Sequence, residues 1–357
     1  MKLLIAGGGT GGHVFPAVAV AKEWLSRGMG REVILIGTRN GIEAKLVPQA
    51  GLPLETIRVA GLKGKGGLTF VRNLALLLPA MCDARAILHR HRVNAAFGVG
   101  GYAAGPMLLA AAMRGIPTVI FEPNAEVGFT NRVLARLAAR VATSYEVQSR
   151  RYAAKAVLTG CPVRPEFFQC PVRAPVAPFR LLITGGSQGA LPINRAVVDS
   201  LDRLEKRKEQ LAIVHQTGER DYDAVRVAYA RRGFASAEVQ PFLANMAERF
   251  AWADLIVCRA GAITAAEVAA AGRAAIFIPF GAATDSHQMR NAQEMARAGA
   301  GRLIPQPELD GQRLASEIFF LLDRPGEMEK LAEGARRLAR PRAARDIVDL
   351  IEEVARA

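Results

Sequence analysis

Two glycine-rich segments of the chain could bind phosphate. Gly7-Gly8-Gly9-Thr10-Gly11-Gly12 follows a short apolar run near the N-terminus, and Gly185-Gly186-Ser187-Gln188-Gly189 follows a similar run halfway along the 357 residues. A glycine turn that leads from a strand into a helix directs backbone N–H groups and the helix dipole at one spot, which attracts phosphate. The repeat therefore predicts two nucleotide-binding-type domains that face a shared cleft.

His13 follows the first glycine segment, and Pro16 stands three residues later. Proline suits the first turn of a helix, so His13 is expected at the helix entrance beside the glycine backbone. Imidazole titrates near neutral pH, so His13 could accept a proton from an attacking hydroxyl or donate a hydrogen bond to a phosphate. A histidine that only caps or packs against the helix is the structural alternative.

Two classes of nucleotide-binding protein have similar glycine loops, but this sequence matches neither of them well. Gly37-Thr38-Arg39 stands where a dinucleotide-binding domain carries an acidic residue for the ribose, which leaves only an NADP enzyme that uses Arg39. A P-loop needs a lysine after its glycines, and His13 occupies that position.

Other polar residues stand where strands are expected to end. Ser187 could donate its hydroxyl to a phosphate or cap the following helix. Glu267 could accept both hydroxyls of a ribose, or it could be the capping-box partner of Thr264. Gln288 begins a helix after an apolar strand, on the side where doubly wound sheets bind ligands. Glycines 98, 100 and 101 could admit a ligand or simply form a turn.

Short apolar runs alternate with helical periodicities and must position these residues. Continuous apolar strands between helices indicate parallel sheets covered on both faces, an α/β fold of two doubly wound domains. Strands are predicted over 2–7, 33–37, 95–99, 117–121, 140–143, 180–184, 211–215, 237–240, 255–258 and 275–279. Helices are predicted over 16–26, 129–138, 192–205, 221–231, 264–271 and 287–298.

The length and the prolines indicate the domain organisation. A chain of this length suggests two domains. Five prolines fall within 161–178, which we interpret as a linker between domains 1–160 and 179–341. An amphipathic helix over 342–357 is expected to pack back on the first domain.

Charge and cysteine content narrow the function further. Lys and Arg outnumber Asp and Glu by 47 to 33, and the net charge of +14 favours an anionic partner. The four cysteines have no C-x-x-C pairing, so we expect reduced thiols and no zinc site. No apolar stretch approaches the roughly 18 residues that span a bilayer.

Four segments together resemble the MurG family of N-acetylglucosaminyltransferases, in order from residue 2 to about 300. They are Gly-Gly-Thr-Gly-Gly-His-x-x-Pro at 8–16, Gly-Val-Gly-Gly-Tyr at 98–102, Thr-Gly-Gly-Ser-Gln-Gly at 184–189 and Cys-Arg-x-Gly-Ala-x-Thr-x-x-Glu at 258–267. The resemblance implies the GT-B fold and inverting transfer of N-acetylglucosamine from UDP-N-acetylglucosamine. The implied acceptor is undecaprenyl-diphosphate-linked N-acetylmuramoyl-pentapeptide, a step of peptidoglycan synthesis that serves cell shape and division.

The resemblance also implies site residues. Glu267 would hold the ribose, Ser187 a donor phosphate and Gln288 the sugar, while Gly100, Gly101 and Tyr102 would lie at the acceptor diphosphate. His13 is our candidate for the catalytic base, and no metal or cofactor is expected. The remaining donor-contacting positions are Thr10, Gly11, Gly12, Asn124, Arg164, Leu243, Ala262, Ile263, Thr264, Ala265 and Ala266.

A lipid-linked acceptor requires contact with a membrane, and residues 68–81 could supply it. Phe70, Leu74, Leu77 and Leu78 are apolar, and basic residues between Lys63 and Arg92 flank the segment. Apolar side chains beside a basic rim are typical of a surface that sits on anionic lipid without crossing it. The alternative is an ordinary buried helix. We expect a peripheral protein on the cytoplasmic face of the inner membrane.

Three other functions remain open from the sequence. Another GT-B transferase could act on a glycolipid or a soluble acceptor, and a sugar-nucleotide epimerase could have a similar fold. A basic nucleic-acid binder is disfavoured, because only 6% of residues are aromatic and the basic residues form no recognised motif. We therefore expect no nucleic-acid partner.

Overall fold

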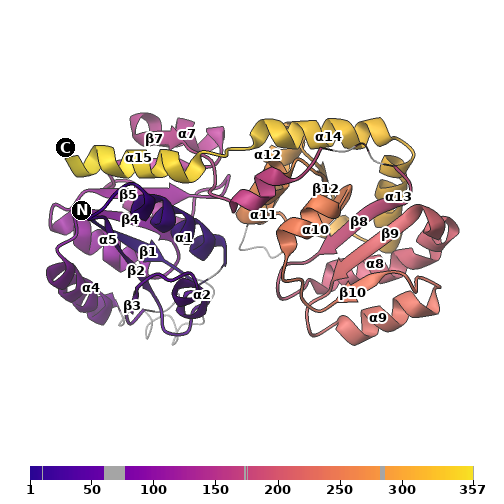
Figure 1. Ribbon diagram of the computed structural model, residues 1–357, viewed down its shortest axis with the longest axis horizontal. Helices are drawn as coiled ribbons and strands as arrows, with labels where there is room; N and C mark the ends of the chain where they lie inside the picture. The colour runs from indigo at the N-terminus through magenta and orange to yellow at the C-terminus, as the bar shows by residue number, and fades with distance from the viewer. Residues whose placement is uncertain (10, 60–76, 173, 175, 282–285, 357) are drawn as a thin grey trace. The chain divides into compact units, whose positions relative to one another are not determined.

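The computed structural model describes the chain except residues 10, 60–76, 173, 175, 282–285 and 357. It divides into two compact units (Figure 1): unit 1 is Met1–Arg164 with Arg340–Ala357, and unit 2 is Pro165–Ala339. Among the described residues, no helix combines the length and the apolar character needed to cross a bilayer.

In the described part of unit 1, seven parallel strands form one sheet in the order β3-β2-β1-β4-β5-β6-β7. The strands are β1 Lys2–Gly7, β2 Glu32–Gly37, β3 Leu54–Thr56, β4 Ala95–Gly100, β5 Thr118–Glu122, β6 Arg140–Thr143 and β7 Ala156–Leu158. The helices are α1 Gly11–Ser26, α2 Glu43–Gln49, α4 Leu77–His91, α5 Ala104–Met113, α6 Phe129–Leu134, α7 Glu146–Tyr152, the 3₁₀ helix η1 Ala153–Lys155 and α15 Ala343–Arg356. Helices α4, α5 and α6 share one apolar core with the strands.

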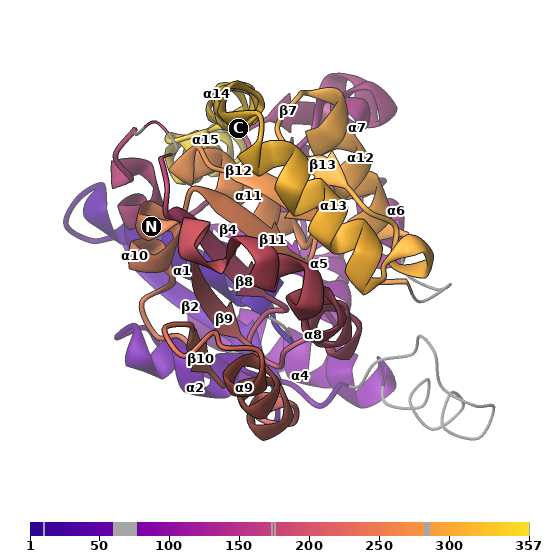
Figure 2. The ribbon, with the colours of Figure 1, turned by 90° about the vertical axis from the view of Figure 1, so that its right-hand side faces the viewer.

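Unit 2 has a parallel sheet of six described strands in the order β10-β9-β8-β11-β12-β13. They are β8 Phe179–Thr184, β9 Leu211–Gln216, β10 Glu238–Gln240, β11 Leu255–Cys258, β12 Ala274–Phe277 and β13 Arg302–Leu303. The helices are η2 Pro165–Gln169, α8 Leu191–Leu204, η3 Glu205–Gln210, α9 Tyr222–Arg231, α10 Met246–Trp252, α11 Ala262–Ala271, α12 His287–Arg297, η4 Gln306–Glu308, α13 Gly311–Leu322 and α14 Pro325–Leu338. One face of this sheet is covered by α8, α9 and α13, which stand in front of it in Figure 2.

The apolar runs explain why these strands form. Leu3, Leu4 and Ile5 of β1 are almost fully buried, as are Leu181 and Leu182 of β8. A strand with helices on both faces buries successive side chains on opposite sides, so the whole run is apolar rather than alternating. All ten predicted strands are present, each bound within two residues of the prediction.

Three strands, the start of one helix and the end of another differ from the prediction. Strands β3, β7 and β13 were not predicted, because two or three residues are too few to form an apolar pattern. Each of them is an edge strand of its sheet. Helix α6 ends at Leu134, four residues before the predicted end at 138. Helix α1 begins at Gly11, five residues before the predicted start. Pro16 therefore lies in the second turn of the helix rather than in the first turn, where its missing N–H would cost no intrahelical hydrogen bond.

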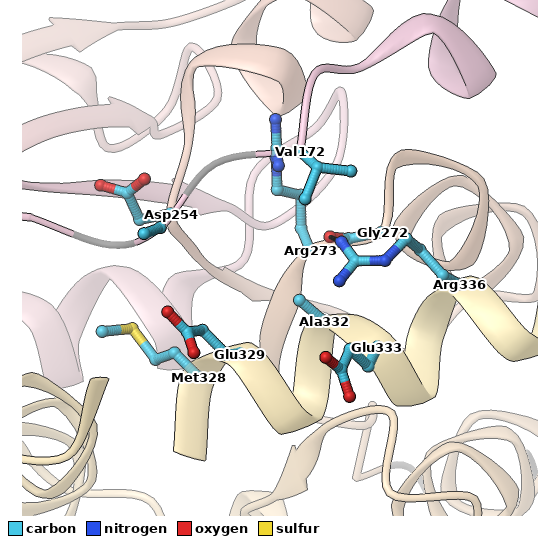
Figure 3. Close-up of a pocket in the computed structure, with 10 residues that line it drawn as sticks. Val172, Asp254, Gly272, Arg273, Met328, Glu329, Ala332, Glu333 and Arg336 are labelled. Atoms are coloured by element: carbon cyan, nitrogen blue, oxygen red, sulfur yellow. Dashed lines mark hydrogen bonds between the residues drawn. The ribbon is translucent and has the colours of Figure 1, made fainter. Parts of the chain in front are cut away.

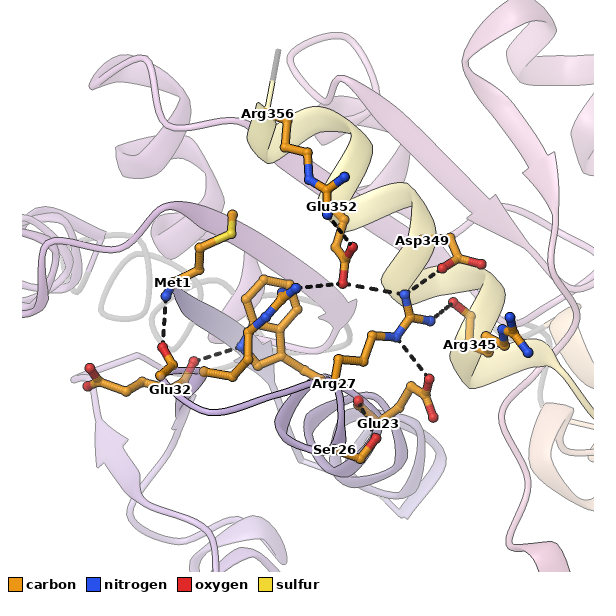
Figure 4. Close-up of polar contacts among 12 residues, drawn as sticks. Met1, Glu23, Ser26, Arg27, Glu32, Arg345, Asp349, Glu352 and Arg356 are labelled. Atoms are coloured by element: carbon orange, nitrogen blue, oxygen red, sulfur yellow. Dashed lines mark hydrogen bonds and ion pairs between the residues drawn. The ribbon is translucent and has the colours of Figure 1, made fainter.

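The C-terminal helix α15 packs on unit 1. Its buried face includes Ile347 and Ile351, and it contacts α1, β4, β5 and β6. An ionic cluster surrounds this contact (Figure 4), in which Arg27, directly after α1, pairs with Asp349 and Glu352 of α15. The apolar face and this partly buried cluster together attach the helix.

The chain passes between the units at two places, after Arg164 and after Ala339. We expected a linker over 161–178. The structure instead packs part of this stretch into unit 2, since Phe167 of η2 is fully buried and meets the ring of Phe250 edge to face at 5.1 Å. Proline spacing alone does not reveal such an anchor.

Candidate substrate sites at two sheet edges

Each sheet has a point at which the strand order reverses, and the glycine loops lie there. In unit 1 the reversal is between β1 and β4, and in unit 2 it is between β8 and β11. Chains leave such a pair of strands in opposite directions, which opens a crevice at their carboxyl ends where doubly wound proteins bind ligands.

In unit 1, the first and third glycine loops are in contact. Gly7 stands opposite Gly100 in the β1–β4 register. A side chain at Gly101 would overlap the carbonyl oxygen of Gly8, and Gly101 has a φ of +82°. Only glycine allows this backbone conformation and this approach. Residues 98–100 thus end β4, and the turn that follows packs against the first loop at Gly101, a pairing that the sequence did not reveal.

His13 lies in the first turn of α1, as predicted, and its imidazole is held by the loop. Its Nδ1 lies 3.0 Å from the carbonyl oxygen of Gly8. A carbonyl only accepts, so Nδ1 carries the proton of the neutral ring and the lone pair is on Nε2. A Cβ on Gly100 would lie 3.0 Å from Nε2, so the ring also faces the third glycine loop. Burial lowers the pKa of His13. The hydrogen bond to the Gly8 carbonyl and the negative charge of Glu43 raise this pKa, but burial has the larger effect.

Glu43, at the start of α2, lies beneath the first glycine loop and was missed in the sequence. Its carboxylate accepts the N–H of Gly9 and both the N–H and the hydroxyl of Thr38, each at 2.8 Å. Burial alone would raise its pKa, but these donors outweigh burial and hold the pKa below its usual value. The Glu43 side chain is therefore ionised, and one of its hydrogen-bond donors, the N–H of Gly9, belongs to the first glycine loop.

The other unit 1 residues implied by the resemblance lie near this edge. Asn124 follows β5, where its backbone N–H donates to the buried carboxylate of Glu122 at 3.2 Å. Tyr102 follows β4 and is 52% exposed. The guanidinium of Arg164 lies 5.7 Å from the ring centre of Phe15 on α1. Gly11 and Gly12 open α1 beside His13, whereas Thr10 is outside the described residues.

In unit 2, the second glycine loop turns tightly between β8 and α8. A side chain at Gly189, whose φ is +71°, would overlap the carbonyl of Thr217. Ser187 is exposed on this loop, and α8 begins only at Leu191, with Ala190 as the N-cap residue. The alternative that Ser187 caps the helix is therefore wrong. Among the described residues, no side chain caps this N-terminus, so its free N–H groups, which exclude Pro192, and its dipole face the loop.

Gln216, at the end of β9, organises the unit 2 edge and was also missed. Its amide nitrogen donates to the carbonyl of Gly186 at 2.8 Å, and its amide oxygen accepts the N–H of Leu243 at 2.9 Å. The side chain is 1% exposed, so these bonds are shielded from water. Gln216 thereby ties the glycine loop to the segment with Leu243, one of the implied donor-contacting positions.

Glu267 lies in the second turn of α11, which follows the neighbouring strand β11. The N-cap of α11 is Gly261 and the helix begins at Ala262, so Thr264 is inside the helix and no capping box with Glu267 exists. Glu267 is half-buried and lies close enough to Cys258 for its charge to add to burial in raising the pKa of that thiol. Residues 262 to 266 form the start of this helix. Thr184, the last residue of β8, stands opposite Cys258, the last residue of β11, so the loops after these two strands leave the sheet at the same edge.

Gln288 opens α12 at the next position along the same edge. Its side-chain oxygen accepts the N–H of Phe280 at 3.0 Å. The buried guanidinium of Arg259 donates to the carbonyls of Ile278 and Pro279 at 3.1 and 3.2 Å, which fixes the chain that leaves β12. Ser187, Glu267 and Gln288 therefore follow β8, β11 and β12 on one edge of the sheet.

Two other features of unit 2 are a cavity and an Asp-x-Asp pattern, and the cavity does not belong to this edge. A cavity of about 260 Å³ (Figure 3) is lined by Asp254 and Arg273, which precede β11 and β12 and so lie at the opposite, amino edge of the unit 2 sheet. The chain contains an Asp-x-Asp pattern at 221–223, where Asp221 accepts a hydrogen bond from Asn194 at 2.7 Å. No group of three or more His, Cys, Asp or Glu among the described residues could hold a metal ion.

The fold and these two edges define a class of enzyme. The family model described as the glycosyltransferase family 28 N-terminal domain matches residues 3–143, and the one described as its C-terminal domain matches residues 180–347. The two matches cover well over half of the sequence, so the chain belongs to glycosyltransferase family 28. This confirms the predicted α/β fold class, GT-B, with two parallel-sheet domains.

Individual relatives show which members of this family the chain is similar to. Proteins of Geotalea daltonii and Geobacter sulfurreducens are 47% and 46% identical over 98% of this chain, covering 96% and 97% of their own lengths. Both carry the name UDP-N-acetylglucosamine–N-acetylmuramyl-(pentapeptide) pyrophosphoryl-undecaprenol N-acetylglucosamine transferase. The crystal structure of MurG from Acinetobacter baumannii matches with a TM-score of 0.77 and 34% identity over 99% of each chain. The resemblance to MurG seen in the sequence is thus confirmed.

A structure of a different enzyme is also similar. The UDP-GlcNAc 2-epimerase of Neisseria meningitidis has a TM-score of 0.71 over 99% of this chain and all of its own, but only 14% identity. At that identity the likeness shows a common fold and no common activity.

Proposed function

We propose that the protein is an inverting glycosyltransferase that moves N-acetylglucosamine from UDP-N-acetylglucosamine to the 4-hydroxyl of undecaprenyl-diphosphate-linked N-acetylmuramoyl-pentapeptide. The observation that carries the proposal is the full-length similarity, at 47% identity, to transferases named for this reaction. The placement of both glycine loops at reversal points of their sheets supports it, since such edges suit diphosphate groups.

The donor is proposed to bind at the carboxyl edge of unit 2. Glu267 would accept the two ribose hydroxyls, the loop 185–189 would bind the diphosphate, and Gln288 would contact the sugar. No described side chain caps the start of α8, so an oxygen of the diphosphate can take the place of that cap. As the glycosidic bond breaks, negative charge grows on the departing UDP. Backbone N–H groups and a helix dipole that already point at this position stabilise the growing charge.

The acceptor is proposed to bind at the edge of unit 1, with its diphosphate at the loops around Gly11 and Gly101. The amide of Gly9 already donates to Glu43, so other amides of these loops are left for the phosphate. The 4-hydroxyl attacks the anomeric carbon from the face opposite UDP, through an oxocarbenium-like transition state as in glycoside hydrolysis. Nε2 of His13 takes the proton from that hydroxyl.

Product analysis tests this function. The full-length protein is incubated with radiolabelled UDP-N-acetylglucosamine and a short-chain analogue of the lipid acceptor, and the products are separated. We expect a labelled disaccharide on the lipid and release of UDP that depends on the acceptor. Consumption of the sugar nucleotide without acceptor would indicate an epimerase or hydrolase, and transfer only to another glycolipid would indicate a different transferase.

We further propose that the protein binds the cytoplasmic face of the inner membrane through α4, α5 and α6. Leu78 on α4 is 76% exposed and Met113 on α5 is 64% exposed. Arg85, Arg114 and Arg136 are exposed on or beside the same helices. Leu77 is only partly exposed, and Phe70 and Leu74 lie outside the described residues. Exposed apolar side chains among arginines suit an anionic lipid surface.

Vesicle flotation tests the membrane proposal. Reversing the charge of Arg114 and Arg136 to Glu should lower binding to anionic vesicles about tenfold or more, since each basic residue near such a surface contributes about 1 kcal/mol. Binding to neutral vesicles should change little. Val172→Glu, on an exposed position of unit 2, is the control. Equal binding of the unmodified protein to neutral and anionic vesicles would remove the electrostatic part of the proposal.

A further inference from the structure

Glu43 connects two loops that the fold brings to one edge of unit 1. Its Oε2 accepts the N–H of Gly9 from the loop after β1, and its Oε1 accepts the N–H and the hydroxyl of Thr38 from the loop after β2. All three donor–acceptor distances are 2.8 Å, and the side chain is 1% exposed. Three donors thus converge on one shielded carboxylate.

The surrounding backbone is shaped for this side chain. A Cβ at Gly8, Gly37 or Gly41 would overlap the Glu43 side chain, so all three positions leave the space that it fills. The glycines come from both connected loops. An apolar residue in place of Glu43 would remove the acceptor that the N–H groups of Gly9 and Thr38 and the Thr38 hydroxyl share, which is costly.

The same loop determines how His13 is held. Gly8 precedes the Gly9 amide that Glu43 accepts, and the carbonyl of Gly8 accepts from Nδ1 of His13 at 3.0 Å. The peptide group between Gly8 and Gly9 is planar, so fixing its N–H also fixes its C=O. We propose that Glu43 is a positioning residue: it clamps this peptide group, and the clamped carbonyl keeps the proton on Nδ1 and the lone pair on Nε2 of His13.

This inference rests on the proposed role of His13 in the transfer reaction. Glu43 touches neither substrate in the proposal and acts only through the peptide group. Only a carboxylate serves, because both of its oxygens must accept. A glutamine of the same shape would place its NH₂ group against an N–H donor of either Gly9 or Thr38. Glu43→Gln should therefore keep the volume of the side chain and release the clamp.

The test compares Glu43→Gln with Glu55→Gln in the full-length protein. Glu55, on β3 of the same sheet, pairs with Arg90 and His91 of α4 and contacts neither glycine loop. Glu43→Gln should lower kcat about 10- to 100-fold, the size of effect that a small misplacement of a reacting group produces, with the donor KM within about twofold. Glu55→Gln should leave both constants within about twofold of the unmodified protein.

A spectroscopic measurement separates this inference from the proposed function. The ¹⁵N shifts of the imidazole, assigned with His13→Gln, report which nitrogen is protonated without any turnover. We expect one fixed tautomer, Nδ1–H, in the unmodified protein and in Glu55→Gln, and an averaged pair of shifts in Glu43→Gln. If His13→Ala kept full activity, the role of His13 would fail while this readout still tested the clamp.

Two results would overturn the clamp. One is unchanged imidazole shifts in Glu43→Gln, and the other is kcat equal to that of the unmodified protein in a variant whose shifts have changed. If Glu43→Gln does not fold, Thr38→Val takes its place, since it removes one of the three donors and keeps the carboxylate. It should shift the imidazole signals in the same direction and lower kcat by about two- to fivefold, and unchanged signals would contradict the proposal.

Discussion

Replacement of His13 by alanine is expected to lower kcat about 10²- to 10⁴-fold, the range that a positioned general base contributes. The bond from Nδ1 to the Gly8 carbonyl leaves Nε2 as the basic atom. The proposed contacts to the ribose, the diphosphate and the sugar of the donor are made by Glu267, the loop 185–189 and Gln288 of unit 2, so the KM for UDP-N-acetylglucosamine should stay within about twofold. Steady-state transfer of labelled sugar measures both constants. His89→Ala, on the exposed last turn of α4, should behave as the unmodified protein.

The pH dependence of the same variant provides a second readout. Burial is the largest influence on His13 and lowers its pKa below 6.5, the ordinary value of imidazole. A base works when deprotonated, so kcat/KM for the acceptor, which reports the free enzyme, should stay level down to about pH 6.5 and fall below it. His13→Ala should lose this acid limb. An acid limb that persists in the variant would assign the titration to another group.

Replacement of Glu267 by alanine is expected to raise the KM for UDP-N-acetylglucosamine about 100-fold or more. Each hydrogen bond to a charged group contributes about 1.5–3 kcal/mol, and the proposal gives Glu267 two such bonds to the ribose. Glu267→Gln keeps one acceptor oxygen and should have an intermediate effect. The affinity for UDP alone, measured by calorimetry, should fall in parallel, because the ribose contact does not involve the sugar.

A matched control for Glu267 lies on the next helix. Glu294 of α12 pairs with Arg297 on the surface, and Glu294→Ala removes a carboxylate from the same unit without touching the proposed site. Its KM should stay within about twofold of the unmodified protein. Affinity for UDP that is unchanged in Glu267→Ala would contradict the assignment of the ribose to Glu267.

Short apolar runs in the sequence predicted most of the strands of this fold. Runs such as Leu3 to Ala6 and Leu255 to Cys258 are buried on both faces, and that burial requires several consecutive apolar residues. Strand β13, Arg302–Leu303, has no such run, because it borders the sheet and is held by its pairing with β12. Its position depends on the rest of the sheet and cannot be read from two residues.

The candidate sites were predicted only where a loop carries its own signal. The glycine loops, His13, Glu267 and Gln288 have that signal in their spacing. Glu43 and Gln216 do not, because each bonds to a loop that follows a different strand. Those contacts depend on which strands are neighbours, and strand order is a property of the whole sheet. The alternative role of Ser187 as a helix cap is wrong for a related reason, since α8 starts only after the loop has finished turning.

The position of bound UDP-N-acetylglucosamine tests the central claim most directly. A crystal structure of the protein with this nucleotide sugar should show the ribose hydroxyls at the carboxylate of Glu267 and the diphosphate at Ser187 and the loop before α8. Density for the nucleotide away from Ser187 and Glu267, such as in the cavity beside Asp254, would contradict the account.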